Sequence, residues 1–206
     1  MTTMTSRREA EPRPRPARPR SLIAAYFANI RSFRRDDWIV YVAWVGLMLG
    51  LVASTSGFLL FGRANGARFP GEAWLVPVGA SIFAVSIAVD TIGHRTVYRE
   101  FLRGGEALVH HITIACGVGA CVLLCAAYDH RATCWIPAMV LTVLSMIYSL
   151  VDEGFHWRRY VSGQSDPVEM WSHVGILVGH TTMMLAWWAW FFGGYVGVAE
   201  TVAAMR

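Results

Sequence analysis

The chain has 206 residues, of which 55% are hydrophobic and only 16% are charged, with a formal net charge of +4. This composition excludes an ordinary water-soluble domain, in which about a quarter of the residues are charged. The excess positive charge comes entirely from arginines that flank apolar runs, so it indicates membrane topology and no nucleic-acid partner.

The first element in the chain is an N-terminal segment that cannot form a core of its own. Residues 1–20 include the stretch EPRPRPARPR, which is too rich in Pro and Arg to bury apolar surface and predicts a disordered cytoplasmic tail. Across residues 21–37, apolar side chains recur at helical spacing against arginines. This second pattern predicts an amphipathic helix that lies on the lipid surface and leads into the first span.

Five apolar runs follow, and each is long enough, or nearly so, to cross a bilayer, which takes about 20 residues per helix. The second and fourth are short unless the helix continues through Asp90 to His94 and through Asp152 to His156. We therefore expect an all-α integral membrane protein with five transmembrane helices in residues 38–206. The runs are Trp38 to Gly62, Trp74 to Val89, Ala107 to Tyr128, Cys134 to Val151 and Met170 to Phe192.

The arginines predict the orientation of these spans. Nine lie in the chain up to Arg35, three lie between spans two and three, and two lie between spans four and five, whereas only four fall on the other side. Because basic residues concentrate in cytoplasmic segments, the N-terminus is expected in the cytoplasm and the C-terminus outside. Arginine without lysine is typical of a GC-rich genome, so we expect a bacterial inner membrane.

One polar pattern occurs twice. The stretches VDTIGHRTVY, from Val89, and VDEGFHWRRY, from Val151, share the pattern V-D-x-x-x-H-x-x-x-Y. With one residue inserted in the second loop, Glu106 and His110 align with Glu169 and His173. The match predicts an internal duplication, in which helices 2-3 and helices 4-5 are two copies of a hairpin (about residues 74–128 and 134–195). Together the copies would form a four-helix bundle as a parallel repeat.

Four of the seven histidines have a carboxylate four residues earlier, whereas chance predicts about 0.5 such pair. Residues i and i+4 share one face of a helix, so each of spans two to five carries an acid and an imidazole on one stripe. Ionisable groups that face lipid are costly, and the stripes are therefore expected to face the bundle interior. The pairs are Asp90 and His94, Glu106 and His110, Asp152 and His156, and Glu169 and His173.

Chain direction sorts these eight residues into two levels, each with two imidazoles and two carboxylates. At a rise of ~1.5 Å per residue the levels lie about 6 Å apart, which predicts a site for two metal ions. Mixed nitrogen and oxygen ligation suits iron first, with zinc, manganese or copper as alternatives. The deeper level holds Asp90, His110, Asp152 and His173, and the shallower level holds His94, Glu106, His156 and Glu169.

Four further residues are candidates for the site. Glu153 forms a Glu-x-x-His pattern with His156, and His180 follows His173 by two helical turns, although a hydrogen-bonded interior histidine is the main alternative for it. Tyr98 and Tyr160 lie one turn beyond their histidines, where a phenol can bond a ligand or relay an electron. The alternative for both tyrosines is an aromatic anchor at the membrane boundary.

These patterns favour a membrane-bound di-metal oxidoreductase, with di-iron as the first expectation, that hydroxylates or desaturates a lipid-soluble substrate. A cytoplasmic donor would supply its electrons. Three alternatives remain open: a divalent metal transporter or sensor, a bis-histidine haem protein with His110 and His173 as ligands, and an accessory subunit of a larger complex. In the last case the acid–histidine pairs would be salt bridges or hydrogen bonds that serve assembly.

Overall fold

The computed structural model describes residues 21–97 and 105–206. Every regular element in these ranges is a helix, and five of the helices, α2 to α6, are long and apolar enough to cross a membrane. The predicted all-helical membrane protein is confirmed at this level. The elements are α1 (Leu22–Ala28), a 3₁₀ turn η1 (Asn29–Ser32), α2 (Arg35–Ala64), α3 (Gly71–Thr96), α4 (Gly105–Ala126), α5 (Arg131–Val161), α6 (Pro167–Phe192) and α7 (Val198–Met205).

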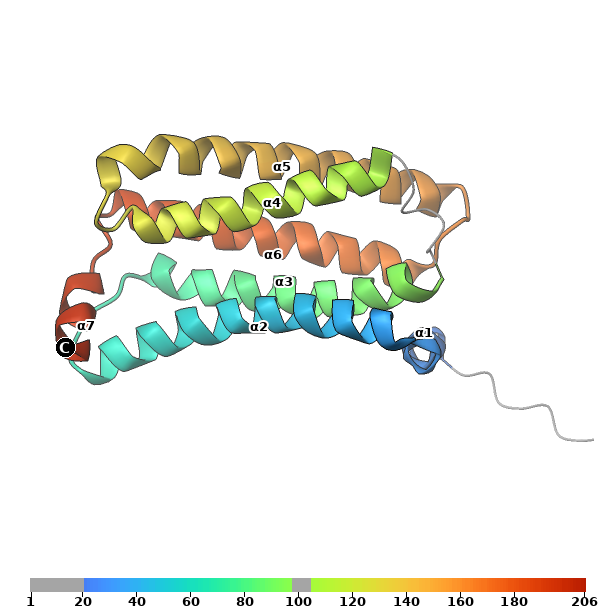
Figure 1. The fold of residues 1–206 in the computed structure, drawn as a ribbon, viewed down its shortest axis with the longest axis horizontal. Helices are drawn as coiled ribbons and strands as arrows, with labels where there is room; N and C mark the ends of the chain where they lie inside the picture. The colour runs from blue at the N-terminus through green and yellow to red at the C-terminus, as the bar shows by residue number, and fades with distance from the viewer. Residues whose placement is uncertain (1–20, 98–104) are drawn as a thin grey trace, which may run out of the picture.

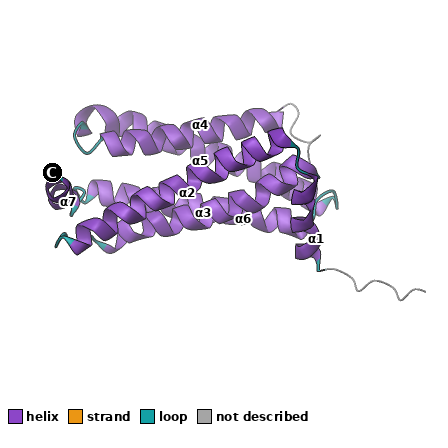
Figure 2. Ribbon diagram, turned by 60° about the horizontal axis from the view of Figure 1, so that its bottom comes forward, coloured by secondary structure: helices purple, strands orange, loops and turns teal. Residues whose placement is uncertain are grey.

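The five long helices lie side by side along the longest axis of the molecule (Figures 1 and 2). One end carries α1 and the start of α2, and the other end carries α7 and the C-terminus (Figure 1). We call these the α1 end and the α7 end. Helices α3 and α5 both continue to the α1 end, so Asp90 to His94 and Asp152 to His156 are helical, as the two short apolar runs required.

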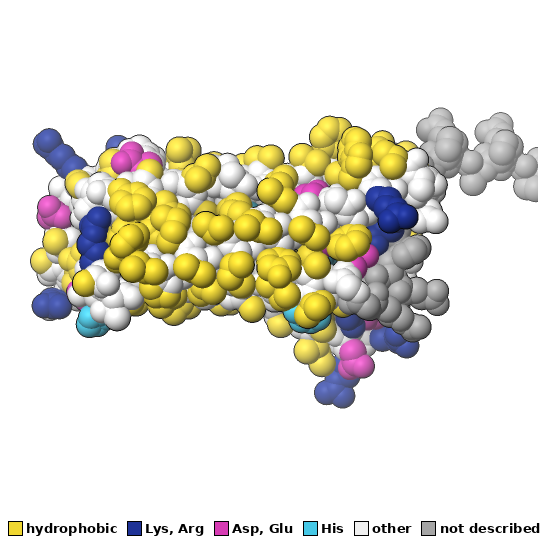
Figure 3. Space-filling model, turned by 90° about the horizontal axis from the view of Figure 1, so that it is seen from above, with side chains coloured by type: hydrophobic (Ala, Val, Ile, Leu, Met, Phe, Trp, Pro, Cys, Tyr) yellow, Lys and Arg dark blue, Asp and Glu magenta, His cyan; other side chains and the backbone are white. Residues whose placement is uncertain are grey.

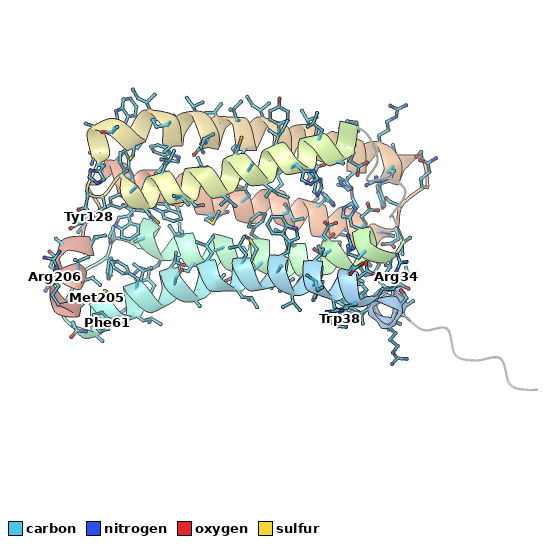
Figure 4. The ribbon with its side chains drawn as sticks, viewed as in Figure 1. Arg34, Trp38, Phe61, Tyr128, Met205 and Arg206 are labelled. Carbon is cyan, nitrogen blue, oxygen red and sulfur yellow. The ribbon has the colours of Figure 1, made fainter. Side chains whose placement is uncertain are left out.

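The surface has the polarity of a membrane-spanning protein. Figure 3 shows hydrophobic side chains over the middle of the visible face, with arginine and acidic side chains gathered toward both ends. Large apolar residues in mid-helix are among the most exposed, such as Val85 at 66% and Leu185 at 65%. Figure 4 places Arg34 and Trp38 at the α1 end and Arg206 at the α7 end. A belt of apolar side chains bounded by charge suits a lipid environment.

Small residues bring α3 and α6 into close contact. A Cβ atom on Gly179 would lie 2.5 Å from the Phe83 nitrogen and 2.9 Å from the Gly79 oxygen, so only glycine fits there. A Cβ atom on Gly175, one turn away, would collide with Ser86. Helices that lack side chains at the interface can pack backbone to backbone, as small residues four apart do in membranes.

The helix pairing differs from the predicted hairpins. Among the described elements, the most extensive contacts are those of α3 with α6 and α4 with α5, followed by α2 with α3 and α5 with α6. Helices α3 and α4, the two arms of the first predicted hairpin, are not among the closely packed pairs of these elements. The apolar runs indicate which segments enter the membrane. They do not indicate which helices pack together, and for α3 and α6 the close contact depends on the small residues between them.

Both ends of the chain also differ in detail from the prediction. Instead of one amphipathic helix over 21–37, α1 ends at Ala28 and passes into the 3₁₀ turn, which is followed by Phe33 in an extended conformation. Helix α2 begins anew because the Asp37 carboxylate accepts a hydrogen bond from the Arg34 backbone N–H at 3.0 Å and thereby caps it. The predicted tail, residues 1–20, lies outside the described residues. The short helix α7 was not predicted.

Candidate metal centre

The α1 end of the long helices holds a cluster of acidic and histidine side chains. Helices α3, α4, α5 and α6 all contribute to it, each from within about three turns of that end. Most of its members are buried, with His156, Glu169 and His173 each only 1% exposed. We call this set the His–carboxylate cluster, and its members are Asp90, His94, Glu106, His110, Asp152, Glu153, His156, Glu169 and His173.

Three helices meet around His173 of α6. Its Nε2 lies 2.9 Å from Oδ1 of Asp90 on α3, and its Nδ1 lies 3.4 Å from Oε1 of Glu153 and 4.0 Å from Oδ2 of Asp152 on α5. The fourth helix joins through His110, whose Nδ1 is 3.0 Å from Asp152 Oδ1. The four residues of the predicted deeper level are therefore brought together by contacts between helices.

A second set of contacts surrounds His156 of α5, nearer the α1 end. Its Nδ1 is 3.0 Å from Oε1 of Glu169, and its Nε2 is 3.7 Å from Oε1 of Glu106. The pairs within a helix connect the two sets, because His94 Nε2 is 3.3 Å from Asp90 Oδ1 and His156 Nε2 is 3.8 Å from Asp152 Oδ1. The acid–histidine stripes predicted from the i, i+4 spacing thus face one another across the interior.

The four imidazole rings form one compact group. His94 has its ring centroid 5.4 Å from that of His110, 5.5 Å from that of His156 and 5.9 Å from that of His173. His110 lies 6.3 Å from both His156 and His173, and those two rings stack at 3.2 Å with an interplanar angle of 23°. Four imidazole rings are costly to bury together inside a membrane unless a shared partner satisfies their nitrogen atoms.

Three sets of three residues within the described ranges can each hold a metal ion, because their ligand atoms all lie within 4.8 Å of one another. Any two of the sets share one histidine, so they form a continuous network. All the donors are imidazole nitrogens or carboxylate oxygens, which bind iron, zinc, manganese and copper. The sets are His94 with His156 and His173; Asp90 with His94 and His110; and His110 with Asp152 and His156.

Several buried atoms of the cluster have no hydrogen bond of normal geometry to any described residue. They are Oδ1 of Asp90, Oε2 of Glu169 and both ring nitrogens of His173. Asp90 Oδ1 and His173 Nε2 are only 2.9 Å apart. This distance suits a hydrogen bond, but the angles at the two atoms do not. Buried polar atoms are almost always satisfied. A metal ion between Oδ1 of Asp90 and one ring nitrogen of His173 would satisfy both atoms at once, and the donor set therefore fits metal ions.

Arg159 is the one member of the site that the sequence did not single out. Its Nη1 donates to both carboxylate oxygens of Glu106 at 2.9 Å, and its Nη2 donates to Oε1 of Glu169 at 2.8 Å. The same Nη2 lies 2.6 Å from Nδ1 of His156. The residue is only 6% exposed. A cavity of about 340 Å³ borders Arg159 and Glu106 on the side of the α1 end.

The remaining predicted residues lie apart from the cluster or outside the described residues. His180 stacks on Phe83 with ring centroids 5.5 Å apart, and its Nε2 is 3.4 Å from the Ser145 hydroxyl, as expected for a bonded interior histidine. Tyr160 is 36% exposed and packs against Trp157. Tyr98 lies outside the described residues. The His–carboxylate cluster therefore includes neither His180 nor Tyr160.

The chain was compared with models of protein families, with characterised proteins and with solved structures, and none of them matched.

Proposed function

We propose that this chain is a membrane-bound oxidoreductase that uses a di-metal centre, with iron as the expected metal, to oxidise a lipid-soluble substrate. The observation that carries the proposal is the network of three overlapping sets of metal-binding donors, all drawn from helices that enter a membrane. Bound iron would supply the activation of dioxygen for hydroxylation or desaturation.

The extent of the network supports two ions in preference to one. The three sets together contain six residues, and an ion held by any one set leaves three of the six outside that set. Ligands at two ions about 3.5–4 Å apart commonly include carboxylates that bridge them. Asp90 and Asp152 suit such a role, since Asp90 contacts histidines on two helices and Asp152 contacts histidines on three.

The position of the site supports a substrate that arrives from lipid and electrons that arrive from water. The cluster lies at the α1 end of the long helices, and arginine side chains gather toward that end of the apolar belt (Figure 3). In the sequence, fourteen of the 18 arginines lie before the first span or in the connections between spans two and three and between spans four and five, so we propose that this side faces the cytoplasm of a bacterial cell, with the inner membrane as the location. A cytoplasmic electron donor would then dock beside the metal centre.

The internal duplication remains part of the proposal as an account of how the site arose. Two ancestral copies would each have supplied an acid–histidine stripe on two helices, and together they form the interior of a four-helix bundle. In this account the pairing of α3 with α6 and α4 with α5 joins one helix of each copy. The bundle is therefore held together by contacts between the copies.

Elemental analysis of the purified protein, with an optical spectrum, tests the proposal against its alternatives. We expect two metal ions per chain and no Soret band. A strong Soret band would instead show a haem protein, and the absence of stoichiometric metal would show an accessory subunit whose polar layer serves assembly. Metal flux into vesicles that is lost in Asp90→Ala and Asp152→Ala, without oxidase activity, would show a transporter. Each of these three outcomes contradicts the oxidoreductase.

A further inference from the structure

Arg159 makes several close polar contacts with the His–carboxylate cluster. It reaches two carboxylates on two other helices, Glu106 on α4 and Glu169 on α6, with three N–O distances between 2.8 and 2.9 Å. Guanidinium groups suit this task because they are always charged and present several donors in a fixed plane. Burying such a group in the boundary of a membrane is costly, so its partners must compensate it.

We propose that Arg159 is a positioning residue of the metal centre, which holds Glu106 and Glu169 as partners of His156 and keeps both carboxylates out of direct coordination. This inference rests on the proposed function, since it assigns places within that centre. It reduces the expected ligands to the six residues of the overlapping sets, which are Asp90, His94, His110, Asp152, His156 and His173.

The geometry around Glu106 supports this division. Both of its oxygens already accept a hydrogen bond from one nitrogen of Arg159. A metal ion on the same carboxylate would bring a second positive charge close to the guanidinium, and the two cations would repel. Neither Glu106 nor Glu169 belongs to any of the three metal-binding sets found among the described residues.

The geometry around Glu169 explains what the held carboxylate does. A histidine that binds a metal through one ring nitrogen usually donates a hydrogen bond from the other to a carboxylate, which fixes the tautomer and the ring orientation. Oε1 of Glu169 lies 3.0 Å from Nδ1 of His156 and also accepts from Arg159 at 2.8 Å. Nη2 of Arg159 lies 2.6 Å from the same Nδ1, so the guanidinium and the Glu169 carboxylate together fix the position of the His156 ring, whose Nε2 lies 3.8 Å from Oδ1 of Asp152.

Arg159 also marks a difference between the two repeat units. In the alignment of Val89 with Val151, the position of Arg159 in the second unit is occupied by Val97 in the first. The two units are therefore inequivalent, because only the second carries an arginine at this position, three residues after its histidine.

Five variants test the assignment, with metal content per chain and the affinity for added Fe²⁺, measured by competition with a chelator, as readouts. We expect Glu106→Gln, Glu169→Gln and Arg159→Met to retain two metal ions per chain at saturation but to bind them about 10–100-fold more weakly. Arg158→Met removes the neighbouring arginine, which is exposed, and should leave the affinity unchanged. Arg159→Lys should recover part of the loss of Arg159→Met, because it keeps the charge.

The outcomes separate this inference from the proposed function. Glu169 is the sharpest case, because its Oε2 has no hydrogen bond to a described residue and is the one oxygen of the two glutamates that Arg159 does not engage. If Glu106→Gln or Glu169→Gln loses an ion even at saturating metal, that glutamate is a ligand and the inference is wrong while the centre stands. If Arg159→Met behaves like Arg158→Met, Arg159 has no positioning role. If the proposed function is wrong, the wild-type protein itself binds no metal, and elemental analysis shows this before any variant is made.

Discussion

A leucine at Gly179 should weaken the metal centre without touching a ligand. A Cβ atom there would lie 2.5 Å from the Phe83 nitrogen, whereas ordinary contact begins at 3.4 Å, so α3 and α6 must separate by the difference of about 0.9 Å. His173 is six residues away on α6, about 9 Å along the axis. Its Nε2 faces Asp90 of α3 at 2.9 Å, and a shift of that size exceeds the roughly 0.2 Å tolerance of metal–ligand distances.

Overpacking of this kind typically costs about 1–3 kcal/mol of folding free energy. We therefore expect Gly179→Leu to lower the thermal midpoint of the detergent-solubilised protein and to reduce the metal bound per chain, with measurements by thermal denaturation and elemental analysis. The matched control is Gly57→Leu on α2, because a Cβ atom there meets nothing within 4 Å. Equal stability and equal metal content in the two variants would refute the view that backbone contact between α3 and α6 sets the geometry of the site.

Three further predictions follow from single contacts. His110→Ala should lose bound metal while His111→Ala, one residue on and exposed, should retain it; equal metal content in both would refute the ligand role of His110. Asp37→Ala should lower the stability by about 1–3 kcal/mol in thermal unfolding, because Asp37 caps α2 and pairs with an arginine of α3 at 2.8 Å. Burial raises the pKa of the Tyr195 phenol, so the folded state holds its proton more tightly than the unfolded chain and stability should fall as the pH rises above about 10. Tyr195→Phe should reduce this alkaline loss, and an unchanged pH profile would contradict the shift.

The membrane spans and the meeting of the acid–histidine stripes could be predicted from the sequence. Apolar length alone identifies a span, because the bilayer requires about 20 residues. The i, i+4 spacing places Asp152 and His156 on one stripe, and the cost of facing lipid turns that stripe inward. Both constraints act on each helix separately. They can therefore be applied to the sequence before it is known which helices are neighbours.

The pairing of the helices and the role of Arg159 could not be predicted in the same way. Hairpin logic favours neighbours in sequence, yet the closest approach joins α3 to α6 through Gly179, which was not recognised as half of a Gly-x-x-x-Gly pair with Gly175. The charge pattern identifies Arg159 only as one of the cytoplasmic arginines. The repeat gives no sign of its role, because the aligned residue in the first unit is Val97. Its position three residues after His156 puts it on the same helical stripe, and that spacing was the signal that could have found it.

X-ray absorption at the metal edge of the purified protein tests the central claim most directly, because it reports the ligands and the neighbouring ion together. The account predicts a first shell of nitrogen and oxygen atoms, scattering from imidazole rings, and a second metal within about 4 Å. Spectra of His173→Ala should lose part of the imidazole contribution. A protein without metal, or one with a single ion surrounded by water oxygens and no imidazole, would contradict the di-metal centre.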